Sequence, residues 1–368
     1  MKKTSRILCA VLATALLVSV MLTGCSAPKL HIGGTPAVAG TVEGKDLPTG
    51  EYLAYLYSTY YDMYINEGLY QYAMYGYDVW NQEYTYGEGK DAPKVNLEKY
   101  MQLATRDLIA RQLVLRDMLA ANNLQWIPEE VETIEKNLKE MGKDAYLPLG
   151  MSDEHFIPVY KDVTLNESAV FYGLYGEGGP RAVSEAERRE YFNKNYLSYK
   201  MISIPLTDDK GSELSKDEQA KVTAKLEGYL ATYNKDKNFE AIVDEYAKSQ
   251  AAEGTKVEPS KDEDNRVNAD ATQMGDEELV KAIRSVEVGK AKVVTYKAGG
   301  SVNTAALILR LDINQPATLF ADSTKQILLG MKWDAFDDEV VKAMGQKTVD
   351  LKKSVVKKCS PINFAMGG

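Results

Sequence analysis

The chain has 368 residues, with 44 lysines and arginines against 53 aspartates and glutamates, so its formal net charge at pH 7 is −9. An acidic surface repels the phosphate backbone of nucleic acids, which argues against a nucleic-acid partner. Two histidines and three cysteines, none at a spacing typical of metal ligands, argue against a metal site and a disulfide framework. We therefore expect no metal and no other cofactor.

Residues 1–24 have the pattern of a secretory signal peptide. The start, MKKTSR, is basic, and the apolar run at residues 7–22 is too short for a comfortable membrane span. The run ends in LTGC, which resembles the bacterial lipobox, where the cysteine is acylated and becomes the mature N-terminus. The alternative is an ordinary cleaved signal with an incidental cysteine. The lipobox interpretation predicts lipidation at Cys25 and an extracytoplasmic protein anchored to the bacterial cell membrane.

Cleavage at this point would change both the charge and the cysteine count. It removes three of the 44 basic residues and no acidic ones, which leaves 41 against 53 and a net charge of −12. Residues 25–40 are rich in alanine, glycine and proline and predict a lipidated tether, in which His31 is a tether residue. Cys359 is left without an intramolecular disulfide partner. A packed thiol is the favoured interpretation of Cys359, and a nucleophile is the alternative.

Residues 41–183 predict a mainly helical region. A short strand and a turn at Gly44 precede a helix that opens near Thr49. Two long helices are predicted next, from the apolar stripe of KYMQLATRDLIARQLVLRDMLAANNL and from IPEEVETIEKNLKEM, where a proline and two glutamates suit a first turn. Ser152 is expected to cap a further helix, with His155 as a cap-region or packing residue rather than a ligand.

Half of the 24 tyrosines lie between Tyr52 and Tyr86, and two interpretations of them are open. A tyrosine-rich surface offers large contact area at low rotameric cost and could bind many unfolded chains. Alternatively, the first of these rings form the buried face of an amphipathic helix and the others fill a loop-rich cap. The density of the cluster predicts that some rings face solvent. The candidate client-binding residues are Tyr52, Tyr55, Tyr60, Tyr64, Tyr72, Tyr75 and Trp80.

Residues 184–312 predict a second domain with a different pattern. The segment SYKMISIPL predicts a strand, and three helices follow, the second in NFEAIVDEYAKSQ and the third in EELVKAIRSV. Two apolar runs around Gly299 and Gly300 predict a hairpin. The order is thus one strand, three helices and two strands. The acidic segment from Glu253 to Leu279 predicts a solvated loop within this order.

These segments, taken in order, resemble known families. SYKMISIPL, NFEAIVDEYAKS, ELVKAIRSVEVGKAKVV and ALILRL resemble the parvulin-type peptidyl-prolyl isomerase domain. VEGKDLPTGEYLAYLY and VSEAERREYFNKNY resemble the N-terminal chaperone region of PrsA-type foldase lipoproteins and SurA-type periplasmic chaperones. The resemblance implies an α+β fold, with a mainly helical chaperone domain and an inserted parvulin-like β-α3-β2 domain. Residues 313–368 are then expected to return to the chaperone domain.

The chain departs from the parvulin pattern at the positions that carry its chemistry. The resemblance implies a histidine in the first strand and another in the last, but Met201 and Leu307 stand at these positions. Met274 is expected to keep one apolar position of the pocket. Prolyl isomerisation depends on twisting and desolvating the amide in a shaped pocket, so the loss of both histidines weakens the case for catalysis without excluding it.

The leading functional prediction is a membrane-anchored extracytoplasmic chaperone of the foldase type. Its partners would be unfolded or newly secreted proteins, and its parvulin-like domain would be degenerate and non-catalytic. One alternative is an active peptidyl-prolyl isomerase with a divergent pocket. The other is a solute-binding lipoprotein, although the long helices predicted before Gly150 argue against its usual repeated βα units.

Overall fold

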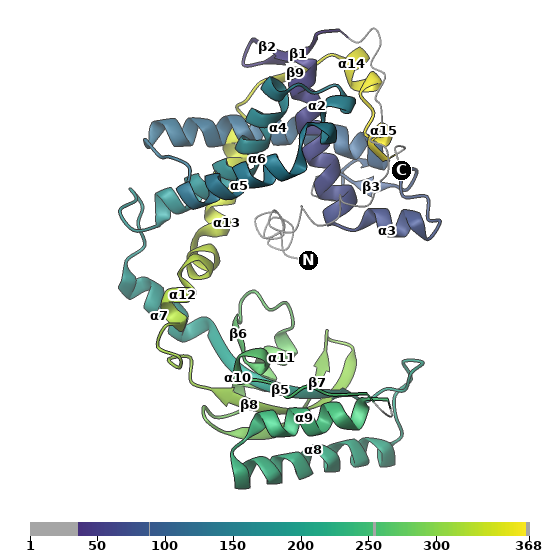
Figure 1. Ribbon diagram of the computed structural model, residues 1–368, viewed down its shortest axis with the longest axis vertical. Helices are drawn as coiled ribbons and strands as arrows, with labels where there is room; N and C mark the ends of the chain where they lie inside the picture. The colour runs from purple at the N-terminus through teal and green to yellow at the C-terminus, as the bar shows by residue number, and fades with distance from the viewer. Residues whose placement is uncertain (1–35, 88, 253–254, 366–368) are drawn as a thin grey trace. The chain divides into compact units, whose positions relative to one another are not determined.

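The computed structural model describes residues 36–87, 89–252 and 255–365, so the predictions for Cys25 and His31 lie outside the described residues. Helices and strands are mixed, and the chain divides into two compact units (Figure 1). The first unit contains residues up to Ala182 and from Trp333 onward, and the second contains Val183–Lys332. The second unit is therefore continuous in sequence, whereas the first is built from two separate segments.

A small antiparallel sheet with the order β2-β1-β9 joins the two segments of the first unit. Its strands are β1 (Val38–Val42), β2 (Lys45–Pro48) and β9 (Val349–Leu351). Both residues of the turn between β1 and β2, Glu43 and Gly44, have positive φ, as the twist of a tight hairpin requires. The strand from the end of the chain thus pairs with the first strand of the described residues.

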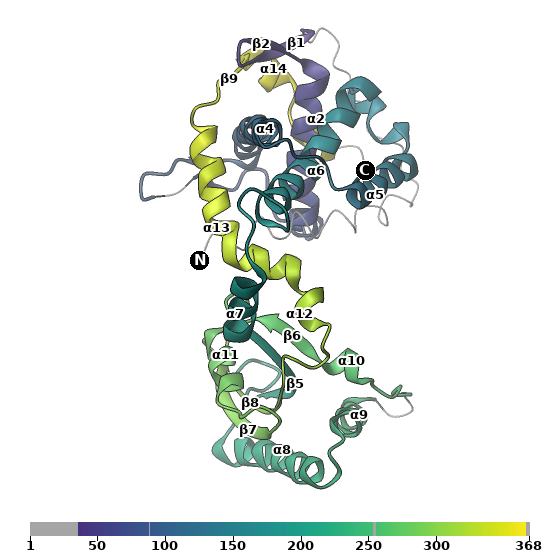
Figure 2. The same ribbon diagram turned by 90° about the vertical axis from the view of Figure 1, so that its left-hand side faces the viewer.

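Helices make up most of the first unit. Three of them, α2 (Thr49–Tyr60), α4 (Leu97–Ala121) and α6 (Asp153–Tyr175), lie side by side in Figures 1 and 2 and pack around buried apolar side chains. The other elements are η2 (Tyr61–Asn66), α3 (Leu69–Met74), β3 (Tyr84–Thr85), β4 (Lys94–Val95), α5 (Pro128–Met141), η3 (Lys143–Ala145), η4 (Leu147–Leu149), α14 (Lys353–Lys358) and α15 (Ile362–Ala365).

Helix α13 (Thr324–Met344) brings aromatic residues of the C-terminal segment into the first unit. The rings of Trp333 and Phe336 lie 5.5 and 5.4 Å, centroid to centroid, from the ring of Phe171 in α6. Trp333 and Phe336 are both buried. Because large buried rings contribute strongly to a core, the C-terminal segment is part of the packing of the first unit.

The second unit contains a four-stranded antiparallel sheet with the order β6-β5-β8-β7. Its strands are β5 (Tyr196–Pro205), β6 (Val267–Asp270), β7 (Ala291–Ala298) and β8 (Val302–Leu311). Its helices are α7 (Glu185–Asn195), α8 (Lys216–Asp236), α9 (Phe239–Gln250), α10 (Asp262–Asn265), α11 (Glu277–Arg284) and α12 (Leu319–Asp322). Capping boxes at Ser184 and Ser215 start α7 and α8, because each serine and the glutamate three residues later satisfy free backbone N–H groups.

Strand β6 corrects the sequence prediction for the acidic segment between Glu253 and Leu279. We expected a solvated loop there, but Val267–Asp270 pairs with β5 as an edge strand, and the short helix α10 precedes it. The strand sequence VNAD alternates apolar and polar residues over only four positions, and alanine, asparagine and aspartate are depleted in strands, so local propensity does not predict it. Its formation depends on the edge that β5 offers.

The two faces of the second sheet have separate apolar cores. One cluster contains side chains of α8 and α9, such as Leu226 and Phe239, together with Ile202 and Leu307 of the sheet. The other cluster contains Ile283 of α11 and residues on the opposite sheet face. Side chains alternate between the faces of a strand, so neighbouring residues of β5 and β8 enter different cores.

Candidate functional site

The first three tyrosines of the predicted client surface lie in the core. Tyr52, Tyr55 and Tyr60 belong to α2, and their exposed fractions are 0%, 2% and 6%. Burial raises the pKa of each of these phenols, because the ionised form would lose its hydration. Their burial favours the alternative interpretation, in which these three rings form the buried face of the helix.

Two further candidates lie between the core and the surface. The half-buried ring of Tyr64 stacks on Tyr60 at 5.1 Å and on the half-buried ring of Trp80 at 5.3 Å between centroids. Tyr64 belongs to η2, a π-helical turn that continues α2. The stacked rings fix the position of the segment that follows η2, so Tyr64 and Trp80 support the surface described next.

Four large side chains at α3 and the turn after it are exposed, and we call them the tyrosine patch: Tyr72, Met74, Tyr75 and Tyr77. Met74 is 80% exposed and Tyr75 is 82% exposed. The rings of Tyr72 and Tyr77 meet edge to face at 6.2 Å. The N–H of Tyr77 donates to the carbonyl of Tyr72 at 3.1 Å, so backbone hydrogen bonds hold the turn.

Two residues of the tyrosine patch, Tyr72 and Tyr75, are among the predicted client-binding residues, and both are exposed. Met74 and Tyr77 are absent from the predicted site. Gly76, which has positive φ, could have indicated that the helix ends at this point and that Tyr77 continues on the surface. Contiguous exposed aromatic and methionine side chains are uncommon on a folded monomer and are typical of interaction sites.

Strand register separates the two positions that the resemblance gives for the parvulin histidines. Met201 lies opposite Ile308, whereas Leu307 lies opposite Ile202. Met201 packs with the α11 cluster, and Leu307 is fully buried in the cluster of α8 and α9. Met201 and Leu307 therefore lie on opposite faces of the sheet, and the residue that shares a face with Met201 is Ile308.

The surroundings of Met201 are apolar. Met274 packs in the same cluster, as do Ile283 of α11 and Val294 of β7. The aromatic residues of this cluster are tyrosines, among them Tyr199, whose pKa is raised by burial. Such side chains can contact a proline ring, but they supply no group that titrates near neutral pH.

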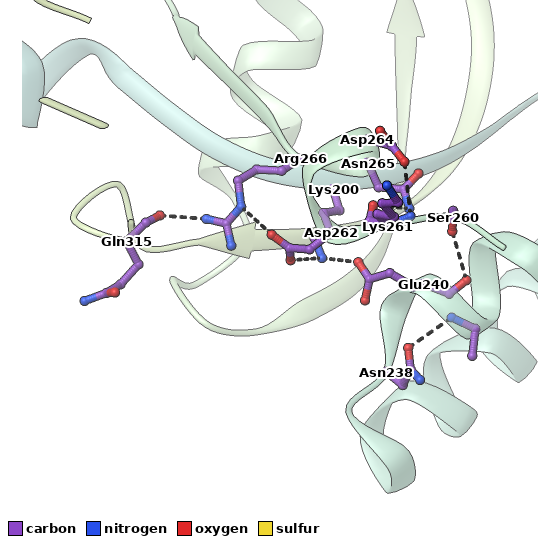
Figure 3. Close-up of polar contacts among 11 residues, drawn as sticks. Lys200, Asn238, Glu240, Ser260, Lys261, Asp262, Asp264, Asn265, Arg266 and Gln315 are labelled. Atoms are coloured by element: carbon purple, nitrogen blue, oxygen red, sulfur yellow. Dashed lines mark hydrogen bonds and ion pairs between the residues drawn. The ribbon is translucent and has the colours of Figure 1, made fainter. Parts of the chain in front are cut away.

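A buried charge lies on the other face of the sheet. The side chain of Lys200 is 4% exposed, and its ammonium forms ion pairs with Glu240 of α9 and Asp262 of α10 (Figure 3). Arg266 donates from Nε to Asp262 at 3.2 Å and from a terminal nitrogen to the carbonyl of Gln315 at 2.6 Å. Hydrogen bonding with Lys200 is the main cause that lowers the pKa of the Asp262 carboxyl.

This arrangement connects the segment before β6 to the sheet and to α9. Ser260 contributes as well, since its N–H donates to Asp244 of α9 at 2.8 Å. Lys200, Glu240, Asp262 and Arg266 form the Lys200 cluster, in which each side chain pairs with an opposite charge of the same set. The Lys200 cluster is therefore structural, and it explains how an acidic segment forms an ordered edge.

The two remaining residues of chemical interest are also structural. His155 accepts or donates a hydrogen bond at 2.9 Å with Ser152, and its ring lies where a Cβ on Gly50 would stand. Cys359 is fully buried, and burial raises the pKa of its thiol to about 11. Both observations agree with packing roles for His155 and Cys359.

Within residues 36–87, 89–252 and 255–365, no group of three or more His, Cys, Asp or Glu side chains could hold a metal ion. Across the same residues, no helix is both long and apolar enough to cross a membrane.

No family model matches the chain, and no curated protein matches it. Two solved structures are similar to it. The foldase protein PrsA from Streptococcus pneumoniae is 12% identical with a TM-score of 0.32, over 77% of this chain and 93% of that chain. The peptidylprolyl isomerase PrsA from Bacillus anthracis is 13% identical with a TM-score of 0.32, over 66% of this chain and 95% of that chain. At these values the similarity assigns no function, which is inferred below from the residues of the chain itself.

Proposed function

We propose that the chain is a membrane-anchored extracytoplasmic chaperone that binds unfolded or newly secreted proteins. The observation that carries the proposal is the tyrosine patch, because Tyr72, Met74, Tyr75 and Tyr77 are all more than half exposed and adjoin one another. Leaving such side chains in water forgoes the free energy of burying them, about 1.5–3 kcal/mol for a large apolar side chain. Binding of a partner that covers these side chains would gain this free energy of burial.

The chemistry of the tyrosine patch suits a variable apolar partner. A tyrosine ring gives contact area with few rotatable bonds, and its hydroxyl can bond to a client backbone. The thioether side chain of Met74 is flexible and polarizable, so it can adapt to different shapes. Neither residue type requires a particular client sequence. This lack of sequence preference suits a chaperone that binds many proteins.

The second unit is proposed to be a parvulin-like domain that has no isomerase activity. The antiparallel order β6-β5-β8-β7, with helices on both faces, supports a single domain built around the strand that carries Met201. The absence of histidine from the sequence after His155 supports the lack of catalysis. The resemblance of the sequence segments to parvulins, taken in order, supports the same assignment.

The membrane anchor is proposed from the sequence. The LTGC pattern supports acylation of Cys25, and the alanine-, glycine- and proline-rich residues that follow support a tether. An anchored chaperone of this kind would meet its clients on the outer side of the membrane.

Site-specific photocrosslinking tests the proposal. A photoreactive phenylalanine derivative replaces Tyr75, and the matched control places it at Val341, an exposed apolar residue of α13 in the same unit. The probe is a reduced and alkylated protein that stays unfolded, compared with its folded form. We expect crosslinks from position 75 to the unfolded form alone, with few from position 341. Equal crosslinking at both positions, or to both forms, would contradict the proposal.

A further inference from the structure

Among the described residues, no strand pairs with the outer edge of β9 in the first sheet. Two hydrogen bonds define its orientation: the N–H of Glu43 donates to the carbonyl of Thr348 at 3.0 Å, and the N–H of Lys352 donates to the carbonyl of Ala39 at 2.8 Å. Residues of an antiparallel edge strand alternate between facing their partner and facing away. The backbone N–H and C=O groups of Val349 and Leu351 therefore point away from β1.

A groove lies along this open edge. Its volume is about 680 Å³, and its walls come from β9, α14 and the first part of α4. Val349 and Leu351 line it, and Arg106 of α4 donates from Nε to the outward carbonyl of Val349 at 3.2 Å. That hydrogen bond is independent evidence that the backbone of β9 is directed into the groove.

The groove has an excess of basic side chains on an acidic protein. Its charged lining residues are Glu98, Lys99, Arg106, Asp350, Lys353 and Lys357. Four of these six are basic, whereas the whole chain has a formal net charge of −9. In the described part of the chain, Lys99, Lys353 and Lys357 form no ion pair. Their charges are available to an anionic ligand.

We infer that this groove binds an extended polypeptide segment with acidic side chains, which pairs with β9 as a fourth strand. The outward backbone groups of Val349 and Leu351 supply the hydrogen bonds of β-strand addition, and these favour a peptide over a free anion. The lysines supply charge complementarity to carboxylates on the segment. The guanidinium of Arg106 can leave the Val349 carbonyl for a carboxylate of the ligand, because charge-assisted bidentate pairing is the stronger contact.

This inference rests on the proposed function in taking polypeptide as the ligand, and it names the class of segment. It concerns a different surface from the tyrosine patch, since no residue of the patch lines the groove. The two sites can therefore be tested separately on the same purified protein.

Fluorescence anisotropy with designed peptides tests the inference. The probe is a labelled peptide of about seven residues, the length of a typical strand, that alternates valine and glutamate. A second peptide carries glutamine in place of glutamate, and a third carries N-methyl groups on alternate residues, which block strand pairing. We expect the glutamate peptide to bind, the glutamine peptide to bind more weakly, and the N-methylated peptide not to bind.

The matching protein variant is Lys353→Gln/Lys357→Gln, and the control is Lys45→Gln/Lys139→Gln, which removes two exposed lysines away from the groove. Loss of two exposed charge contacts should raise the Kd of the glutamate peptide about threefold to tenfold, with no change in the control. All four lysines are exposed, so both variants should keep the fold, which circular dichroism verifies.

Three outcomes would overturn the inference: no binding of the glutamate peptide, equal binding of the N-methylated peptide, or equal Kd values for the two lysine variants. If any of these occurs while position 75 still crosslinks unfolded protein, the groove assignment alone fails. If the peptides bind as expected and position 75 gives no crosslinks, the groove stands and the proposed chaperone function fails.

Discussion

Met201 and Ile308 lie directly opposite each other in the ladder between β5 and β8, on the sheet face covered by α11. Cross-strand neighbours of this kind have Cβ atoms about 4.5–5.5 Å apart, so their side chains act as one surface. The parvulin resemblance implies a pair of histidines in these two strands, and the chain has two apolar side chains instead. The difference leads to a prediction about catalysis.

We predict that the protein accelerates cis–trans isomerisation of a proline tetrapeptide little or not at all. The barrier to rotation is about 18–20 kcal/mol, and an apolar pocket that binds the planar and twisted amides equally does not lower it. The exchange rate of the tetrapeptide, measured by NMR with and without the protein, checks this. An enhancement that disappears in the Met201→Gln variant would contradict the prediction and support the isomerase alternative.

The Lys200 cluster predicts an asymmetry between two sets of substitutions. Glu240→Gln/Asp262→Asn leaves the buried Lys200 ammonium without an anionic partner and should lower the free energy of unfolding by about 3 kcal/mol. Lys200→Met removes the buried charge and keeps most of the apolar stem, so its cost should be smaller, about 1 kcal/mol or less.

Urea unfolding followed by circular dichroism measures both effects. The control is Lys281→Met/Glu278→Gln, which removes an exposed ion pair of α11 and should leave the free energy of unfolding nearly unchanged, because solvent screens the pair. If Lys200→Met lowers the free energy of unfolding as much as the loss of both carboxylates does, then an unpaired buried ammonium is not the cause of the destabilisation.

The same cluster predicts a dependence on pH. Lys200 holds the pKa of Asp262 below its ordinary value, so this contribution to stability is present above the ordinary carboxyl pKa and is lost as the pH falls through the lower, folded one. The melting temperature should therefore fall less between pH 7 and about pH 3 in Asp262→Asn than in the unchanged protein. Equal decreases in both proteins would show that Asp262 is not linked to stability.

Cys359 should react slowly in the folded protein. It is fully buried, and the pKa of its thiol is raised to about 11, so both access and the thiolate fraction are low. In a chain that starts at Ser26, Cys359 is the only cysteine. The absorbance released by a chromogenic disulfide reagent therefore measures the reaction of Cys359 alone. We expect Cys359 to be labelled slowly in buffer and rapidly once urea unfolds the protein. Rapid labelling in buffer would support the nucleophile alternative.

The lipid anchor is tested by Cys25→Ala. Without the acylated thiol the protein should move from the membrane fraction to soluble or precursor forms. Fractionation of bacterial cells and N-terminal sequencing measure the change. A variant that stays with the membrane and has a mature N-terminus at residue 25 would show that the lipobox interpretation is wrong.

Periodic segments of the second unit could be predicted from the sequence. In NFEAIVDEYAKSQ the apolar residues recur at helical spacing, and α9 forms over Phe239–Gln250 with its N-cap at Asn238. The hairpin around Gly299 and Gly300 forms as well, since both glycines adopt positive φ between β7 and β8. In these segments local preference and tertiary structure agree.

The register of β8 could not be predicted. Its run ALILRL is apolar at consecutive positions, because both faces of the sheet are covered by helices. Such a strand has no period-2 pattern that separates its faces, so the sequence does not show that Ile308, and not Leu307, shares the face of Met201.

The exposed tyrosines could not be separated from the buried ones either. The segment Tyr61–Asn66 forms a π-helical turn after α2, which shifts the phase of the side chains that follow. A helical stripe fitted to Tyr52, Tyr55 and Tyr60 therefore gives no information on Tyr72 or Tyr75. Only the three-dimensional arrangement distinguishes the core rings from the tyrosine patch.

The most direct test of the chaperone proposal is light scattering by a denatured client during dilution into buffer. The unchanged protein should slow aggregation at near-stoichiometric ratios, and Tyr72→Ser/Tyr75→Ser/Tyr77→Ser should lose most of this protection at unchanged helicity. The control is Leu147→Ser/Val341→Ser, which removes two exposed apolar side chains elsewhere in the first unit and should protect like the unchanged protein. Equal protection by the tyrosine variant and the control would contradict the central role of the tyrosine patch.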